Sequence, residues 1–136
     1  GAAWTLPLLV LSMVFAASTL AVHTTEVTMA ALPQIDRLLV SLSAGLYEEL
    51  LFRMVGIALL HAIFVDVLRL RNGTGTALAI LGTALAFAWY HDPIASPALG
   101  VFAFVAGLEL GMLFVWRGFA VVVWTHVLYD IAVTML

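Results

Sequence analysis

The chain has 136 residues, of which 65% are hydrophobic and 10% charged, and its formal net charge is −3. This balance lies far outside the soluble range and predicts a single integral membrane domain. The chain contains no lysine and no cysteine, so a nucleic-acid-binding surface, a polybasic membrane patch, disulfide bonds, thiolate metal sites and a cysteine nucleophile are all excluded.

Polar residues divide the apolar sequence into five segments of about the length of a transmembrane helix, which needs roughly 20 residues. We expect these spans at about residues 2–22, 37–68, 76–90 and 96–116, and from residue 119 to the end of the chain. The apolar runs are continuous and do not alternate with polar residues. This pattern predicts an all-α, polytopic transmembrane helix bundle and argues against a transmembrane barrel.

The first two spans differ from an ordinary transmembrane helix in character or in length. The first resembles a signal peptide, but no basic residue precedes it and it is long enough to cross a bilayer, so we expect it to be retained. The second is long for one crossing, which predicts tilt or extension beyond the membrane. We divide the chain into residues 1–32, an N-terminal transmembrane helix and polar loop, and residues 33–136, the core.

Arginines in the loops predict an orientation. Residues 69–75 are expected to form a loop because asparagine and glycine stop a helix, and Arg117 with Gly118 is expected to form a tight turn. Both lie on one face of the bundle, which the positive-inside rule assigns to the cytoplasm. The amino terminus is then cytoplasmic as well.

Glu48, Glu49 and Arg53 lie in the middle of the second span. A charge at the centre of a bilayer costs about 2.5–3.5 kcal/mol on insertion scales, so each of them needs a partner or a function. Glu49 and Arg53 are four residues apart and share a helical face, where an ion pair lowers the cost of burying both. Glu48 is turned about 100° away, which leaves it without a local partner and makes it a candidate general base.

Two histidines and one aspartate form the other polar clusters. His91 ends the third span just before an Asp-Pro pair, where an imidazole can reach both water and the bundle interior. His126 and Asp130 are four residues apart in the fifth span, so the carboxylate can orient the imidazole. Counting along the spans brings these groups and Glu48 into the half of the membrane away from the arginine-bearing loops. We therefore expect a water-accessible cavity there.

Three motifs together carry a resemblance to a known family. Glu48-Glu49-x-x-x-Arg53, Phe87-x-x-x-His91 and His126-x-x-x-Asp130 resemble, in order and approximate spacing, the motifs of the CAAX-protease and bacteriocin-processing (CPBP, Abi) family of glutamic intramembrane proteases. The resemblance covers roughly residues 33–136, and the small-residue pattern Gly107-x-x-x-Gly111 is similar to the family's penultimate helix. It implies a protease, which we expect in the bacterial inner (plasma) membrane.

The resemblance also implies roles for the polar residues. Glu48 would be the general base that activates a water together with His91, while Arg53 would hold the glutamate pair in place. His126 and Asp130 would stabilise the developing oxyanion. Because an ionised Asp130 cannot donate a hydrogen bond, we expect His126 to donate and Asp130 to orient it, unless Asp130 is itself protonated.

Simpler interpretations stay open beside these. Glu49 with Arg53 is also explained as a purely structural ion pair, and each histidine as a hydrogen-bonding or interfacial group. Glu109, in the fourth span, belongs to no motif and is a neutral core acid, a neighbour of the cavity or a substrate contact. His61 and Asp66 lie toward the arginine-bearing end of the second span and are expected to be solvated.

The leading hypothesis is a cofactor-independent endopeptidase that hydrolyses a peptide bond of a membrane-associated or lipid-anchored protein or peptide, at or just within the bilayer. Its substrates are either prenylated CAAX termini or bacterial peptides such as bacteriocin leaders and carboxy-terminal sorting signals. A cavity that opens away from the cytoplasm favours the second class.

Two other functions remain. In one, Glu48, His91 and His126 bind zinc and Glu49 is the base, although the chain has no HExxH spacing. In the other, the chain is a non-enzymatic proton-coupled carrier or an immunity-type binding protein, because proton relays use the same residue types. The lack of an inverted repeat and of a helix broken at mid-membrane argues against a carrier.

Overall fold

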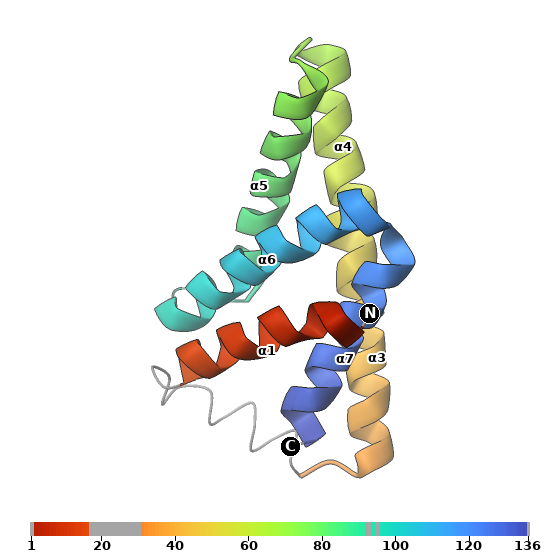
Figure 1. Cartoon of the computed structure of the whole chain (residues 1–136), viewed down its shortest axis with the longest axis vertical. Coiled ribbons are helices and arrows are strands. Elements are labelled where there is room, and N and C mark those ends of the chain that lie inside the picture. The colour runs from red at the N-terminus through yellow and green to blue at the C-terminus, as the bar shows by residue number, and fades with distance from the viewer. Residues whose placement is uncertain (1, 17–30, 92–93, 95, 136) are drawn as a thin grey trace.

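The computed structural model describes residues 2–16, 31–91, 94 and 96–135, and the helices in these ranges pack into one bundle (Figure 1). They are α1 (Ala2–Ala16), a long helix (Gln34–Val67), α5 (Asn72–Tyr90), α6 (Pro97–Arg117) and α7 (Phe119–Met135). No strand occurs in the described ranges, and the predicted all-α helix bundle is confirmed.

The long helix changes its hydrogen-bonding pattern along its length. It consists of α3 (Gln34–Glu49), η2 (Leu50–Ile57), α4 (Ala58–His61) and η3 (Ala62–Val67), of which η2 and η3 are π-helical. At 1.5 Å per residue a helix of 34 residues is about 51 Å long, whereas the hydrocarbon core is about 30 Å thick. Tilt or extension beyond the membrane is therefore required, as its length in the sequence indicates.

Within the residues that the structure describes, three helices are long and apolar enough to cross a membrane on their own, namely Gln34–Val67, α5 and α6. α1 and α7 are apolar but shorter. The last part of the first expected span, residues 17–22, lies outside the described residues, as does the Asp-Pro pair after His91. Which face of the bundle is cytoplasmic stays a prediction.

The loop expected at residues 69–75 is shorter than the sequence indicates. α5 begins at Asn72, and the Gly75 amide donates to the Arg71 carbonyl at 2.9 Å. A Cβ at position 75 would collide with the side chain of Val65, so this glycine serves close packing between α5 and the end of the long helix. Glycine here permits helix approach, and only residues 68–71 form the turn, with Arg69 at φ 59°.

Both ends of α6 carry residues that are typical of helix termini. The Ser96 hydroxyl accepts a hydrogen bond from the Leu99 amide at 3.4 Å, and Pro97 occupies the first turn, where a missing amide costs nothing. At the other end Gly118 has φ 86°, a backbone conformation that glycine adopts without steric cost. This turn directs α7 back along α3.

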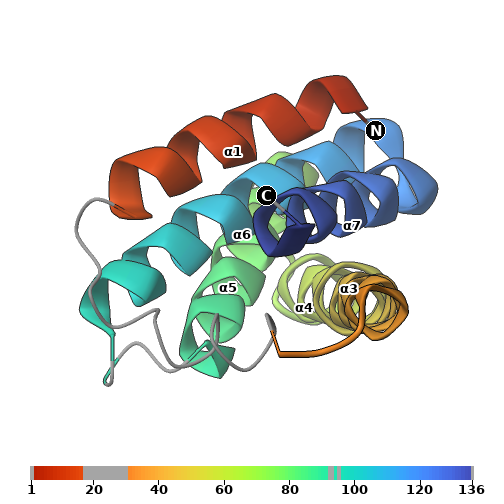
Figure 2. The same cartoon turned by 90° about the horizontal axis from the view of Figure 1, so that it is seen from below.

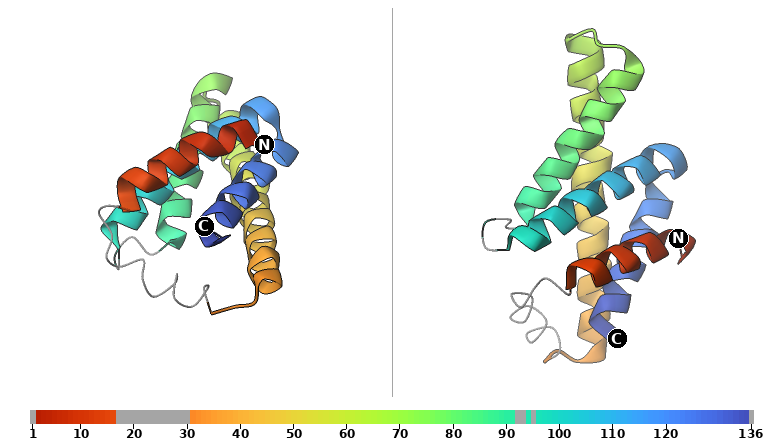
Figure 3. Two further views of the ribbon diagram at one scale, coloured as in Figure 1. Left: turned by 60° about the horizontal axis from the view of Figure 1, so that its bottom comes forward. Right: turned by 60° about the vertical axis from the view of Figure 1, so that its left-hand side comes forward.

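The helices pack in layers, with α6 and α7 in the middle (Figure 2). Seen from below, α1 lies over α6 and α7, while the long helix and α5 lie on their opposite side (Figure 2). The hairpin of α4 and α5 projects beyond the other helices (Figure 3). One apolar core cluster joins Leu8 of α1 to α6 and α7, and a second joins Phe52 of η2 to α5 and α6. Large apolar side chains also cover the outer faces, which fits contact with lipid.

The close contact between α5 and α6 predicts a stability effect. A Cβ added at Gly107 would lie 3.0 Å from the Ala84 Cα, so Gly107→Val must push the two backbones apart. We expect a loss of about 1–3 kcal/mol, the usual cost of overpacking, measured as a lower unfolding temperature in detergent. Gly73→Val is the matched control, because nothing lies within 4 Å of a Cβ at that position. Equal unfolding temperatures for the two variants would contradict the importance of this contact.

Candidate active site

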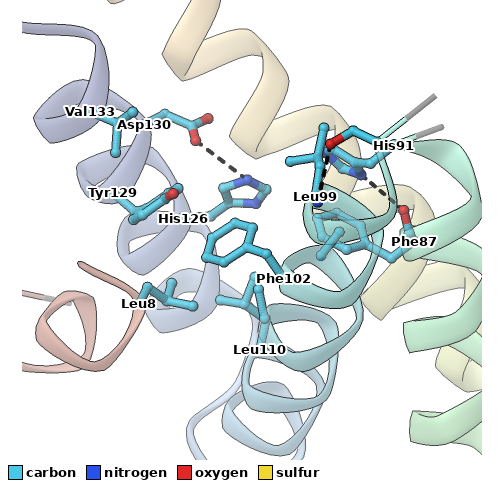
Figure 4. Close-up of a pocket in the computed structure, with 13 residues that line it drawn as sticks. Leu8, Phe87, His91, Leu99, Phe102, Leu110, His126, Tyr129, Asp130 and Val133 are labelled. Atoms are coloured by element: carbon cyan, nitrogen blue, oxygen red, sulfur yellow. Dashed lines mark hydrogen bonds and ion pairs between the residues drawn. The ribbon is translucent and has the colours of Figure 1, made fainter. Parts of the chain in front are cut away.

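The three sequence motifs meet around the carboxylate of Glu48, the penultimate residue of α3. Its Oε2 lies 3.9 Å from Nε2 of His91, which follows the last residue of α5, and 3.8 Å from Nε2 of His126 on α7. Nε2 of His126 is also 3.7 Å from Oδ1 of Asp130, one turn further along α7 (Figure 4). The structure thus brings together the four residues that the sequence indicates as catalytic.

The adjacent carboxylate of Glu49 is fully buried and has two partners. Its Oε2 lies 3.1 Å from Nε of Arg53, so the expected pair four residues apart is present. Its Oε1 accepts a hydrogen bond of 2.7 Å from Nδ1 of His126. The sequence spacing assigned the orientation of His126 to Asp130, whereas the closest carboxylate is Glu49, which is 77 residues away in the sequence.

Arg53 is buried to 1% exposure and is surrounded by compensating groups. Besides Glu49, its guanidinium lies over the ring of Phe87 at 4.4 Å from the centroid, where the face of the ring attracts a cation. One terminal nitrogen donates to the Gly107 carbonyl at 3.5 Å. These contacts join the long helix to α5 and α6.

His91 is held by the end of its own helix. Its Nδ1 lies 2.9 Å from the Phe87 carbonyl, and because a carbonyl can only accept, Nδ1 carries the proton. In the neutral imidazole Nε2 then has a free lone pair, and this is the atom that faces Glu48. The side chain is 28% exposed, more than that of His126 at 8%.

A cavity of about 330 Å³ lies beside the two histidines. Its polar lining comes from His91, His126, Asp130 and Ser96, and most of the remaining lining is apolar (Figure 4). Its other lining residues are Leu8, Phe87, Leu99, Phe102, Ala103, Ala106, Leu110, Tyr129 and Val133. Glu48 does not itself line the cavity, and its Oε2 is buried and has no hydrogen-bond partner among the described residues.

The sequence did not predict that α1 lines the cavity, because Leu8 is one apolar residue among many in that helix. Tyr129 lines the cavity, whereas Trp124 is exposed. Glu109 does not line it, and its Oε1 is buried without a hydrogen-bond partner in the described part of the chain.

His61 and Asp66, which the sequence predicts to be solvated, lie at the far end of the long helix and do not line the cavity. Asp66 is exposed, and His61 is hydrogen-bonded to the Asn72 side chain at 2.7 Å. Within the ranges that the structure describes, no group of three or more His, Asp or Glu side chains is arranged to hold a metal ion.

The model of the Rce1-like family, described as type II CAAX prenyl endopeptidase, matches residues 30–132. This segment is most of the chain and contains all the residues of the three motifs. No curated protein and no solved structure matches.

The buried pair of Glu49 and Arg53 predicts a non-additive loss of stability. Glu49→Leu leaves the cation of Arg53 buried without its carboxylate, which typically costs about 3–5 kcal/mol. In the double variant Glu49→Leu/Arg53→Met neither member of this ion pair is left buried without the other, so we expect it to be more stable than Glu49→Leu alone. Unfolding in mild detergent measures both. If the losses of the single variants simply add, the two side chains are not coupled.

Proposed function

The chain belongs to the type II CAAX prenyl endopeptidase Rce1-like family, and from this membership and the site geometry we propose that it is an intramembrane endopeptidase in which Glu48 and His91 activate a water. The family identifies a CAAX-type protease that acts on a peptide or protein, and the apolar helices identify a membrane protein. The roles of individual residues and the choice of substrate are our proposal.

One observation carries the mechanism, namely the separation of Glu48 Oε2 from Nε2 of His91. At 3.9 Å the two atoms are too far apart for a direct hydrogen bond, but a water between them can bond to both. The carboxylate is an acceptor, and Nε2 is an acceptor as well, because Nδ1 donates to the Phe87 carbonyl. A bridging water would therefore donate both of its hydrogens to these groups and direct its lone pairs toward a substrate carbonyl.

This arrangement supports a shared base. As the oxygen of the water attacks the peptide carbonyl, one proton passes to Glu48 or His91, and the same group later returns it to the leaving amine. His91 borders the cavity and its Nε2 lies 3.9 Å from Oε2 of Glu48, so in this mechanism a water bound at His91 is shared with the carboxylate of Glu48. The apolar surroundings limit the access of other water molecules.

His126 is suited to stabilising the oxyanion. Its Nδ1 donates to Glu49, so Nε2 can donate to the oxyanion only when the ring carries both protons. Three carboxylates near the ring, those of Glu48, Glu49 and Asp130, balance the resulting positive charge. In this mechanism Glu49 and Arg53 position His126, and Asp130 contributes charge from 3.7 Å.

The cavity supports a substrate with apolar side chains next to the scissile bond. Most of its lining is apolar, and the only described ionisable side chains in that lining are His91, His126 and Asp130 of the sequence motifs and Tyr129 of α7. We propose that the substrate is a membrane-associated or lipid-anchored peptide. Prenylated CAAX termini and unprenylated bacterial peptides are the two classes to compare in the assay.

The first test is cleavage of such peptides by the purified protein in lipid. We expect Glu48→Gln, His91→Ala and His126→Ala to lower the rate by about 100-fold to 10,000-fold, the range attributed to general acid–base and oxyanion groups. Glu49→Ala is expected to lower the cleavage rate less, because Glu49 acts only by positioning His126. Cleavage products are measured by mass spectrometry.

Two matched variants control for loss of folding. Glu109→Gln changes a membrane glutamate that does not line the cavity, and His61→Ala changes a histidine bonded to Asn72 at the far end of the long helix. Both should keep the rate of the unmodified protein. Undiminished cleavage by Glu48→Gln would end the proposed mechanism.

Zinc-dependent hydrolysis is the alternative within the same substrate class, with Glu48, His91 and His126 as ligands. The two hypotheses differ in one measurement. We expect the rate to be unchanged after exhaustive dialysis against a chelator, with the metal content of the protein measured in parallel. A loss of cleavage that added zinc restores would favour the metal-dependent mechanism.

A further inference from the structure

The apolar end of the cavity is built in part by α1, which lies outside the segment that the family model matches. Leu8 of α1 and Leu110 of α6 lie together on one side of His126, while Asp130 lies on the other (Figure 4). Leu8 is 1% exposed and belongs to the core cluster that includes Ala106 and Leu110. A residue of the first helix therefore closes one end of the site.

α1 is fixed along its length, so this wall has a defined position. The ring of Trp4 packs edge-to-face against Trp116 with centroids 5.2 Å apart. Phe15 packs in the same manner against Phe102 at 6.2 Å. Between these two contacts the helix presents Leu8 to the cavity.

The two ends of the cavity differ in chemistry. Histidines and Asp130 surround the end where a peptide carbonyl would react, and the end at Leu8 has no charged lining residue. Ala103 and Ala106 of α6 contribute small side chains to the lining. A volume of about 330 Å³ is at the lower end of the range of roughly 300–1,000 Å³ found for ligand sites. Such a cavity holds one or two side chains and selects them by size.

We propose that Leu8 sets the size of the apolar side chain that is accepted next to the scissile bond. The space that Leu8 leaves in the cavity limits the size of this side chain, so a smaller residue at position 8 would admit a larger one. This inference rests on the proposed proteolytic function, since it concerns the seat of the substrate in the same cavity. α1 is then a specificity element, and the reacting groups come from the other helices.

The first experiment compares Leu8→Ala with Leu6→Ala, the same substitution at a residue of α1 that is 62% exposed. The substrates are two peptides that differ only by Leu or Phe beside the cleavage site, which is first located by mass spectrometry. We expect the ratio of kcat/KM for the Phe peptide to that for the Leu peptide to rise at least about tenfold in Leu8→Ala, the scale of discrimination by small volume changes in an apolar pocket. Leu6→Ala should keep the ratio of the unmodified protein.

This ratio does not depend on the fraction of correctly folded protein, because both peptides are cleaved by the same preparation. A loss of stability in Leu8→Ala therefore leaves the result interpretable. An unchanged ratio in Leu8→Ala, with cleavage retained, would overturn the inference and leave the proteolytic function intact.

The second experiment does not require hydrolysis. A peptide with a photoreactive diazirine analogue of leucine at the same position is irradiated with the Glu48→Gln variant in lipid vesicles, and the crosslinked residues are mapped. We expect crosslinks at Leu8, and crosslinks confined to exposed residues such as Leu6 or Val10 would overturn the proposed seat. Crosslinking at Leu8 without any cleavage by the unmodified protein would support the seat and contradict the proteolytic function.

Discussion

The structure depends on the burial of one carboxylate, that of Glu49, inside an apolar bundle. Fully removed from solvent, it is compensated by the guanidinium of Arg53 at 3.1 Å and the imidazole of His126 at 2.7 Å. An unpaired charge at such a place is costly, so the partners must stay within reach. This requirement fixes α7 against the long helix and directs Nε2 of His126 toward Glu48.

The neighbouring groups complete this arrangement with a cation–π contact and a hydrogen bond to the backbone. The ring of Phe87 lies over Arg53, and its backbone carbonyl accepts the Nδ1 proton of His91. One residue of α5 therefore supports both the buried cation and the histidine beside the cavity. Oε2 of Glu48 has no hydrogen-bond partner among the described residues, which suits the proposed role of binding a water.

The polar part of the site could be largely anticipated from the sequence, whereas the apolar part could not. Spacing of four residues correctly paired Glu49 with Arg53, because such residues share a helical face. The hydrogen bond between Glu49 and His126 joins residues of different helices and has no local signal. Leu8 could not be selected, because a helix surrounded by lipid and protein is apolar on every side. Gly75 was interpreted as a helix stop because its packing against Val65 is visible only in three dimensions.

The distance in sequence between Glu49 and His126 has a consequence for the newly made protein. Helices emerge from the ribosome in chain order, so the glutamates enter the membrane before α7 has been synthesised. Until α7 packs against α3, the carboxylate of Glu49 has the guanidinium of Arg53 beside it but lacks the imidazole of His126. The polar cluster of Glu48, Glu49, His126 and Asp130 is therefore assembled only when α7, the last of these helices to be synthesised, has joined the bundle.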